Sequence, residues 1–428
     1  MKSGRARRGA AWAVISVAAA LACRSSDSRA TSGPQTVTTT LGDTTVVRTL
    51  AIADSSVLLR LVPELRIGDP DGAEEYTFAM ITELAPSPRG GVYAWDQGLT
   101  VLREYDSTGT FVRQIGRKGS GPGEYLAANG IVTAPDGRLV LWDARNARIS
   151  LYSPDGTYAT AFRAPSTLHT NHALQIDSAG RLYIEFWPRP MDARTGAPPP
   201  VGMIRLSLDG TVIDSVVSPR TSFTPATLVA SRDGATAMYG VPFAPQRIVA
   251  MSAFGQWITG NGERYAITVQ RDGQPMLRIE RDVPQVEVRP EEHAEAERRI
   301  TWSMRQTFPE WTWAGPAMPS RKPFVLSVLA DADGRIWVRR SMPAERIASS
   351  ADDEQRPRQE SGPPPRQWAQ PIAYDIFDRG GRLLGHLPVG RAQLMHVRGD
   401  RVWAVVRDSL EVPYVTRFRV EPSLATRQ

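Results

Sequence analysis

Three histidines and one asparagine are the side chains best placed for ligand chemistry in this 428-residue chain. His169 and His172 are three residues apart, a spacing that can bring two imidazoles onto one metal ion or polar ligand. Asn129 and His172 fall at equivalent positions of a sequence repeat, and His396 lies on an equivalent segment, closer to its turn. We predict that these four residues bind a ligand, and we assign no metal ligands because a zinc hydrolase needs three.

Motifs of the common catalytic sites are absent. Residues 119–124, GSGPGE, are rich in glycine but lack the Lys-Ser/Thr pair and the helix start of a phosphate-binding loop. The chain has no GxSxG nucleophile elbow and no HExxH pair. Asp96 and Asp143 occupy equivalent repeat positions, which indicates a structural hydrogen-bonding role. No catalytic residue is predicted.

The N-terminus has the features of an export signal. Residues 2–8 are basic, residues 9–22 are largely apolar, and Cys23 follows directly. The segment Ala20-Leu21-Ala22-Cys23 resembles a bacterial lipobox, although Leu is commoner at the first position and a small residue at the second. Cys23 is the only cysteine, so the chain has no intramolecular disulfide. We predict a signal peptide over 1–22, lipid attachment at Cys23, and a membrane-anchored protein of the cell envelope that faces the periplasm or the exterior.

Composition and charge restrict the partners. The net charge is +6, and removal of four basic residues with the signal peptide leaves about +2, which gives no basic footprint for nucleic acid. Residues 24–46 are rich in Ser and Thr and poor in large apolar side chains. We therefore predict a lipidated flexible tether over 23–56 and no nucleic-acid partner.

An internal repeat of 47 residues predicts the strands that position these side chains. Trp95-Asp96 recurs as Trp142-Asp143, and Gly90 recurs as Gly137. Short runs rich in β-branched and aromatic residues alternate with Asp-Gly turns, and the repeat length suits a four-stranded propeller blade. The tryptophans of the second strands are predicted to lie in the core.

Counting the first turn of each repeat gives six blades. These turns contain Gly90, Gly137, Gly180, Gly234, Gly334 and Gly399. The last repeat lacks a fourth strand, because only eight residues follow Val420. Residues 61–67 are predicted to supply that strand beside residues 414–420, which would close the ring. The fold class is therefore all-β, a six-bladed β-propeller over 57–420 closed by an N-terminal outer strand, with a tail at 421–428.

The long connections are predicted to emerge on one face of the propeller. First-to-second and third-to-fourth turns are tight, whereas the long excursions fall in the other two classes of connection, which share the opposite face. Residues 290–307 have a helical pattern with Pro290 at the start. They predict a helical insertion over 290–313, between blades 4 and 5, that is either a lid or a plug of the channel mouth. Residues 342–368 are polar and Pro-rich, and predict a mobile loop.

The segment FVRQIGRKGSGPGEY, followed by PDG, WD and SPDG, resembles the NHL-type and TolB-like six-bladed propellers of exported bacterial proteins. The resemblance is closest over about residues 57–165 and covers most of the mature chain more loosely. It implies the fold, and it says little about function because propellers carry many functions.

Two functions fit the sequence. The first is an exported, lipid-anchored propeller that binds a protein or glycan through the face with the long loops, with no cofactor. The alternative is a metal-dependent hydrolase or lyase, similar to lactonases, with Ca or Zn in the channel mouth. The resemblance implies that such enzymes hold their metal with His or acidic side chains, and no such set can be mapped onto this chain.

Overall fold

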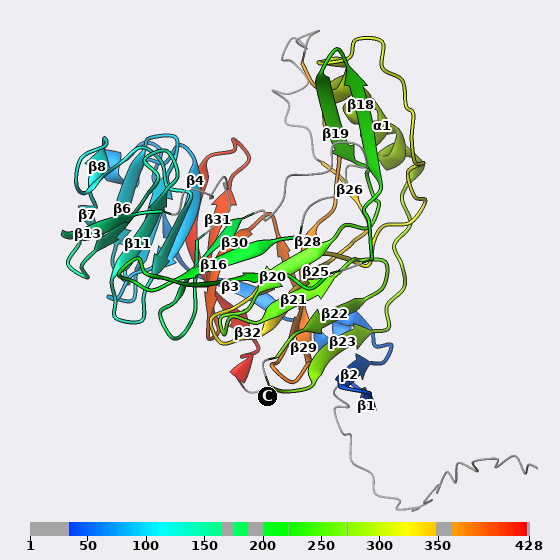
Figure 1. The fold of residues 1–428 in the computed structure, drawn as a ribbon, viewed down its shortest axis with the longest axis horizontal. Helices are drawn as coiled ribbons and strands as arrows, with labels where there is room; N and C mark the ends of the chain where they lie inside the picture. Colours follow the sequence, from blue (N-terminus) through cyan, green and yellow to red (C-terminus); the bar gives the residue numbers. More distant parts are fainter. Residues whose placement is uncertain are drawn as a thin grey trace, which may run out of the picture. The chain divides into compact units, whose positions relative to one another are not determined.

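Six β-sheets form the body of the computed structural model, which describes residues 34–164, 174–186, 200–220, 222–271, 273–347 and 362–425 (Figure 1). Each blade has four antiparallel strands, and the sheet of blade 4 carries two further strands. Blades 1 to 3 contain β4 Ile81–Pro86, β5 Val92–Asp96, β6 Val101–Tyr105, β7 Phe111–Gln114; β10 Gly130–Thr133, β11 Leu139–Asp143, β12 Arg148–Tyr152, β13 Tyr158–Arg163; β14 Gln175–Ile176, β15 Leu182–Phe186, β16 Gly202–Leu206 and β17 Val212–Val217. Blades 4 to 6 contain β20 Ile248–Met251, β21 Trp257–Gly260, β22 Ala266–Val269, β23 Met276–Arg281; β24 Val325–Ala330, β25 Ile336–Arg340, β28 Ile372–Phe377, β29 Leu383–Gly390; β30 Gln393–Arg398, β31 Arg401–Arg407, β32 Pro413–Glu421 and β3 Arg60–Ile67.

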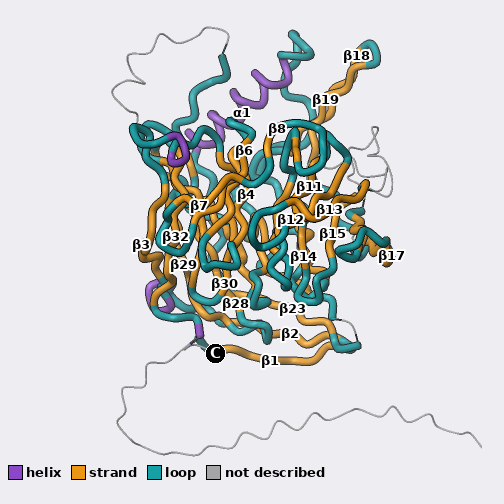
Figure 2. Tube along the Cα trace, turned by 90° about the vertical axis from the view of Figure 1, so that its left-hand side faces the viewer, coloured by secondary structure: helices purple, strands orange, loops and turns teal. Residues whose placement is uncertain are grey.

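The first strand of each blade is the innermost one. Contacts of β4 with β10 and β30, of β10 with β14, and of β20 with β24 link the blades around the ring. The remaining elements are additional to the four strands of each blade, and Figure 2 shows several of them, such as α1 and the hairpin β18–β19. They are β1 Thr36–Leu41, β2 Thr44–Thr49, η1 Asp54–Val57, η2 Glu74–Tyr76, β8 Arg117–Lys118, β9 Glu124–Tyr125, β18 Thr227–Arg232, β19 Ala235–Gly240, α1 Pro290–Arg305, β26 Glu345–Arg346 and β27 Trp368–Ala369.

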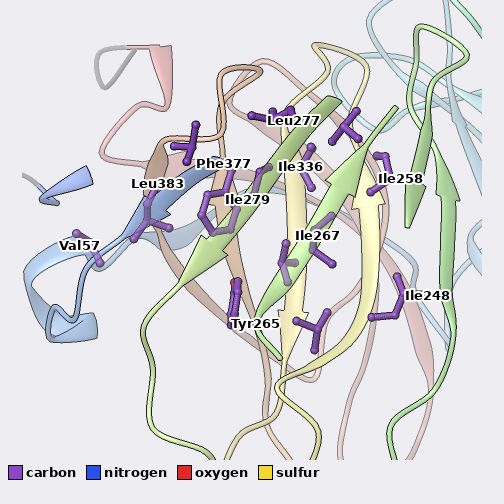
Figure 3. Packing of buried hydrophobic residues seen from close by; sticks show 14 residues of the cluster. Val57, Ile248, Ile258, Tyr265, Ile267, Leu277, Ile279, Ile336, Phe377 and Leu383 are labelled. Carbon is purple, nitrogen blue, oxygen red and sulfur yellow. The ribbon is translucent and has the colours of Figure 1, made fainter. Parts of the chain in front are cut away.

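Buried apolar side chains fill the spaces between neighbouring blades. Each blade interface has its own cluster, and the cluster between blades 4 and 5 also takes Val47 and Val57 from the N-terminal segment (Figure 3). Trp95, Trp142 and Trp337 are among the largest fully buried side chains, and Trp403 is buried too. The prediction that the second-strand tryptophans are core residues is therefore confirmed.

The ring closes as the sequence predicts. Strand β3 pairs antiparallel with β32, with Leu61 opposite Val420 and Ile67 opposite Val415, and it forms the outer strand of blade 6. Closure leaves the N- and C-terminal strands hydrogen-bonded in one sheet, so the sheet edges that would otherwise be open are paired. The predicted tail at 421–428 begins inside β32, and Leu424 is fully buried with its N–H bonded to Asp400.

Part of the predicted flexible tether is instead a β-hairpin. Strand β2 pairs parallel with β23, and β1 pairs antiparallel with β2, so blade 4 has six strands. Val46 and Val47 are buried against the blade. The prediction missed this because the segment is Thr-rich, yet Thr and Val favour strands and Gly42-Asp43 supplies the turn between them.

The prediction that Gly234 lies in the first turn of blade 4 was wrong. Gly234 lies in the turn of the β18–β19 hairpin, which is a separate two-stranded sheet between blades 3 and 4. The first turn of blade 4 contains Gly255, where Ser252 accepts hydrogen bonds from Phe254 and Gln256. Phe254 precedes Gly255, so this turn lacks the Asp-Gly signal on which the prediction relied.

Removing the side chain of Ile67 tests how strongly the closing strand holds blade 6. Ile67 is 2% exposed and packs between blades 6 and 1. We expect Ile67→Ala to lower the free energy of unfolding by about 3 kcal/mol, because it leaves a cavity in a packed interface. Leu58→Ala is the control, since Leu58 is 49% exposed. Equal stability of the two variants in urea unfolding would show that the closing strand contributes little.

Candidate binding face

Three insertions that emerge from the long-loop face of the propeller fold together into one unit, which we call the cap. It consists of the hairpin β18–β19 between blades 3 and 4, helix α1 with the segment to Met318 between blades 4 and 5, and the short pair β26–β27 within blade 5 (Figure 1). The predicted loop 342–368 contributes both strands of that pair, so its two ends are ordered. Residues 348–361 of that loop lie outside the described residues.

Helix α1 begins at the predicted residue and ends earlier than expected. Pro290 occupies the first turn, where its missing N–H costs nothing, and Glu291 and Glu292 favour the positive end of the helix dipole. The helix ends at Arg305, so the predicted stretch to residue 313 includes a non-helical segment with Trp311. The helix therefore begins at the predicted residue, Pro290, and ends before the predicted helical insertion does.

The apolar stripe of α1 packs on the hairpin. Met304 is fully buried, and Phe308 and Trp311 join it against Leu228 and Val241. Ile300, Met304 and Phe308 recur every four residues and form a stripe that faces the hairpin β18–β19, with Ile300 partly buried. The cap has a small hydrophobic core of its own.

Polar contacts attach α1 to the rest of the cap. Glu295 accepts hydrogen bonds from the backbone N–H groups of Gln367 (2.8 Å) and Trp368 (3.2 Å), and Arg299 donates to the carbonyl of Pro364 (2.5 Å). The Arg289 guanidinium lies over the ring of Trp368 at 5.5 Å. The helix thus holds the end of the blade 5 insertion in place.

A buried ion pair fixes the cap to blade 5. Lys322 Nζ lies 2.6 Å from Glu292 Oε1 and donates a hydrogen bond to the carbonyl of Met342 (3.2 Å). The Lys322 side chain is fully buried. Burial lowers the pKa of Lys322, and the Glu292 carboxylate opposes that decrease. Because each charge is held by the other, the loss of one partner would leave an unpaired charge in the interior.

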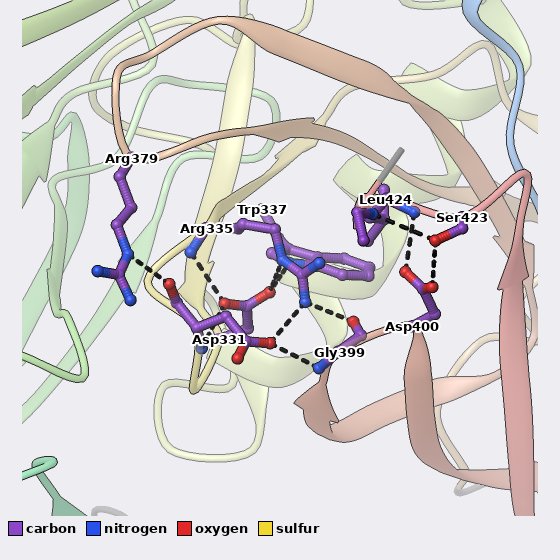
Figure 4. Close-up of polar contacts among 10 residues, drawn as sticks. Asp331, Arg335, Trp337, Arg379, Gly399, Asp400, Ser423 and Leu424 are labelled. Carbon is purple, nitrogen blue, oxygen red and sulfur yellow. Dashed lines mark hydrogen bonds and ion pairs between the residues drawn. The ribbon is translucent and has the colours of Figure 1, made fainter. Parts of the chain in front are cut away.

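The opposite face, with the tight turns, uses its polar groups internally (Figure 4). In blade 5, Asp331 accepts hydrogen bonds from Arg335 (2.6 Å) and Trp337 (2.9 Å). In blade 6, Asp400 accepts from the Leu424 N–H (2.8 Å) and from Ser423 (2.5 Å). These bonds keep the turns short and leave these carboxylates with little capacity for a ligand.

A buried charged network joins blades 4 and 5 to the N-terminal segment. Asp375 is fully buried, accepts from Tyr265 (2.7 Å), lies 2.8 Å from His386 Nδ1 and forms an ion pair with Arg281 (2.5 Å). Asp54 of η1 pairs with Arg281 (2.8 Å) and with Arg340. Burial alone would raise the pKa of Asp375, but His386, the two arginines and Tyr265 outweigh it and lower that pKa to about 2.

This network does not suit a divalent metal ion. Oxygen and nitrogen atoms of Asp54, Asp375 and His386 lie within 4.8 Å of one another, which is close enough for a shared ligand sphere. However, the two carboxylates already neutralise Arg281 and Arg340, and a metal would have to displace both guanidinium groups. No other group of three His, Cys, Asp or Glu side chains among the described residues has such proximity.

Two of the four predicted ligand-binding residues lie in the described chain, and ligand binding by the four residues stays a prediction. Asn129 precedes β10 at the long-loop face, and its side-chain oxygen accepts a hydrogen bond from the Ala144 N–H (3.0 Å). His396 lies on β30, three residues before the turn at Gly399, and so near the tight-turn face. His169 and His172, like Cys23, lie outside the described residues. Asn129 and His396 therefore lie toward opposite ends of the inner strands of their blades.

The structural role predicted for the repeated aspartates agrees with their contacts. Asp96 accepts from the N–H groups of Ala79 (2.7 Å) and Met80 (3.0 Å), and Asp143 accepts from Leu126 (2.8 Å). Each aspartate thus ties the end of a second strand to the loop that enters its own blade. The charged network, in contrast, was not predicted, because its members come from five separate elements and follow no repeat position.

Two titratable side chains on neighbouring inner strands have opposite effects on stability at acid pH. Burial raises the pKa of Glu83 on β4 from 4.5 to about 7, and burial with a smaller effect of Arg398 lowers the pKa of His396 from 6.5 to about 4. Between pH 7 and 4.5 folded Glu83 takes up a proton that the unfolded chain does not, which stabilises the fold. Between pH 6.5 and 4 unfolded His396 takes up a proton that the folded chain does not, which destabilises it.

We therefore expect the unfolding temperature of the protein to change little between pH 7 and 4.5, because the contributions of Glu83 and His396 largely cancel. Glu83→Gln should lose stability as the pH falls through this range, and His396→Gln should gain it. Thermal unfolding followed by circular dichroism at several pH values measures both slopes. Variants that follow the unmodified protein at every pH would contradict the pKa shifts.

Comparisons with known proteins agree with the fold. Residues 100–190 match the model of family DUF5128, described as a 6-bladed beta-propeller. No curated protein matches the sequence significantly. Together with the six closed blades, the family match shows an all-β six-bladed propeller, with one α-helix among the residues that the structure describes.

Solved structures resemble the chain at low identity. A Bacteroides fragilis protein named as exported has 12% identity and a TM-score of 0.44 over 88% of this chain and 99% of its own. A member of the DUF4221 family from Bacteroides vulgatus has 10% identity and a TM-score of 0.49 over 85% and 98%. Virginiamycin B lyase from Staphylococcus aureus has 9% identity and a TM-score of 0.37 over 84% and 99%. Likenesses this distant assign no ligand or activity to the present chain.

Among the described residues, no helix combines the length and the apolar character needed to cross a bilayer.

Proposed function

We propose that this protein is an exported propeller, anchored by a lipid on Cys23, that binds a protein or glycan partner in the cell envelope through the cap. The observation that carries the proposal is the convergence of three insertions, from separate places in the sequence, into one folded unit on the long-loop face. Insertions that only tolerate sequence change have no reason to share a core.

The exposed surface of the hairpin gives the cap features of a contact site. Tyr239 on β19 is 36% exposed, and both β18 and β19 pair only with each other among the described strands. An aromatic side chain with little conformational entropy to lose, beside strand edges with unpaired backbone groups, favours binding of a macromolecule. The NHL-type or TolB-like subtype stays a prediction of the sequence.

Site-specific photo-crosslinking in living cells tests this function. A benzophenone amino acid at Tyr239 is expected to give a discrete adduct, and the same amino acid at Tyr158 on the outer strand of blade 2, 39% exposed, is expected to give none. Protease or glycosidase sensitivity of the adduct then separates a protein partner from a glycan. Adducts at both positions, or at neither, would contradict binding through the cap.

The lipid anchor has its own test. Cys23→Ser is expected to move the protein from the membrane fraction to the soluble envelope fraction, and mass spectrometry of the mature N-terminus should show a lipidated Cys23. An unmodified Cys23 within a longer chain would exclude the anchor and leave the cap proposal intact.

The metal-dependent alternative is separated from partner binding by metal analysis of the purified protein. We expect no stoichiometric ion. A bound Ca or Zn that is lost in His172→Ala would instead support the hydrolase or lyase.

A further inference from the structure

A pocket of about 490 Å³ lies at the foot of the cap, and neither Asn129 nor His396 is part of its wall. Its wall includes Arg48 near the end of β2, Arg264 between β21 and β22, and Phe324 just before β24. Strands β2 and β23 run parallel and end together here, and the chain leaves β23 at Asp282 to form the cap. The volume is in the range of sites for small molecules or single groups of a larger ligand.

The charges around the pocket do not balance. Arg48 pairs with Asp282 (2.8 Å), Glu280 pairs with Arg278 (2.7 Å), and Arg281 is neutralised within the buried network. The side chain of Arg264 is exposed and forms no hydrogen bond or ion pair with any described residue, and its backbone carbonyl accepts from the Ala266 N–H (2.9 Å). One positive charge at the rim is thus available to a ligand.

The remaining wall limits what the ligand can be. Tyr265 and Arg281 are buried and held by Asp375, so this side of the pocket is rigid. Val283, Pro284 and Phe324 give an apolar side. Because Glu280 and Asp282 are paired with Arg278 and Arg48, the pocket has one uncompensated positive charge. A single carboxylate matches this charge and can bind the guanidinium through two parallel hydrogen bonds, whereas a doubly charged phosphate would leave an excess of negative charge.

We propose that this pocket binds a carboxylate group, with Arg264 as its charged partner and Phe324 and Pro284 in contact with the body of the ligand. The carboxylate could belong to a uronic acid of a glycan or to the C-terminus of a peptide, which share this chemistry. The proposal concerns a site at the foot of the cap and depends neither on the lipid nor on the partner that Tyr239 would contact.

Calorimetry on the purified mature chain, with Cys23→Ser to keep it soluble, tests the site with two pairs of probes. Glucuronate is compared with glucuronamide, and N-acetyl-alanyl-alanine with its C-terminal amide. We expect one carboxylate to bind, its amide to bind about tenfold more weakly, and the preferred pair to identify the source of the carboxylate.

Variants of Arg264 test whether this residue causes the preference for the carboxylate over its amide. Arg264→Gln should weaken the carboxylate about tenfold and abolish the preference over the amide, and Arg264→Lys should restore part of both. Arg232→Gln, at the tip of the hairpin, is the charge-matched control and should change neither. The proposal is overturned by equal binding of acid and amide, by unchanged affinity in Arg264→Gln, or by no heat from either acid up to about 10 mM, which corresponds to negligible affinity.

Discussion

Asp375→Asn is expected to lower the free energy of unfolding by about 3–5 kcal/mol, the cost of leaving a buried charge without its partner. The carboxylate of Asp375 neutralises Arg281, whose side chain is fully buried, and it is within reach of Arg340. Asparagine keeps the shape and removes the charge, so two guanidinium groups would share Asp54 alone. Urea unfolding of the full mature chain measures the loss.

Asp282→Asn is the matched control, because the Arg48–Asp282 pair is exposed and such pairs contribute about 0–1 kcal/mol. The pH dependence adds a second readout. The folded pKa of Asp375 is about 2 against an ordinary value of 3.8, so its contribution is present above pH 3.8 and is lost as the pH falls toward 2. The network would not be stabilising if Asp375→Asn unfolded with the same midpoint as Asp282→Asn.

Glu292→Gln is expected to cost about 3 kcal/mol and to release the cap from the propeller, because Lys322 would then be a buried cation without a counterion. The effect should be local. Hydrogen exchange is expected to increase in α1 and around Met342, to which Lys322 donates, while the strands of blades 1 and 2 keep their protection.

A second variant separates charge from folding. Replacing both partners, Glu292→Leu with Lys322→Met, removes the two charges together and is expected to recover most of the lost stability, as apolar pairs often match a buried ion pair. If exchange in α1 is unchanged in Glu292→Gln, the ion pair does not hold the cap.

The blades with regular repeats could be predicted from the sequence because their turns repeat the same chemistry. Glycine at the turn position adopts a positive φ in blade 1 at Gly90 and in blade 2 at Gly137, where other residues would be strained. The closing strand could be predicted because the last repeat lacks a fourth strand, and because Ile67-Gly68 and the later Tyr76 repeat Ile115-Gly116 and Tyr125 at the end of blade 1. The sequence repeat therefore predicts each blade that keeps the common glycine turn.

The errors arose where a local signal had two possible uses. Asp233-Gly234 marks a hairpin turn in any context, and the sequence does not say whether that hairpin belongs to a blade or to an insertion. The Thr-rich segment of β1 and β2 forms strands because β23 offers an unpaired edge, which is a tertiary cause that composition cannot show.

The candidate site was harder to predict than the fold. The order of the strands in a blade predicts the face from which the long loops emerge, and the three insertions of the cap do emerge from that face. The members of the cap and of the charged network meet only after the propeller closes, because Asp54 comes from the N-terminal segment while Arg281 and Asp375 come from different blades. No spacing in the sequence connects them.

Excision of the hairpin tests binding through the cap most directly. The Val241 N–H donates to the Ala226 carbonyl at 2.9 Å, so residues 227–240 can be replaced by a short glycine linker without separating the chain ends. The measurement is the Kd of the excised and intact mature chains for the partner captured at Tyr239. We expect the propeller to unfold at nearly the same temperature and the affinity to fall about a hundredfold, a loss of about 2.7 kcal/mol. An unchanged Kd in the excised chain would show that the partner binds elsewhere.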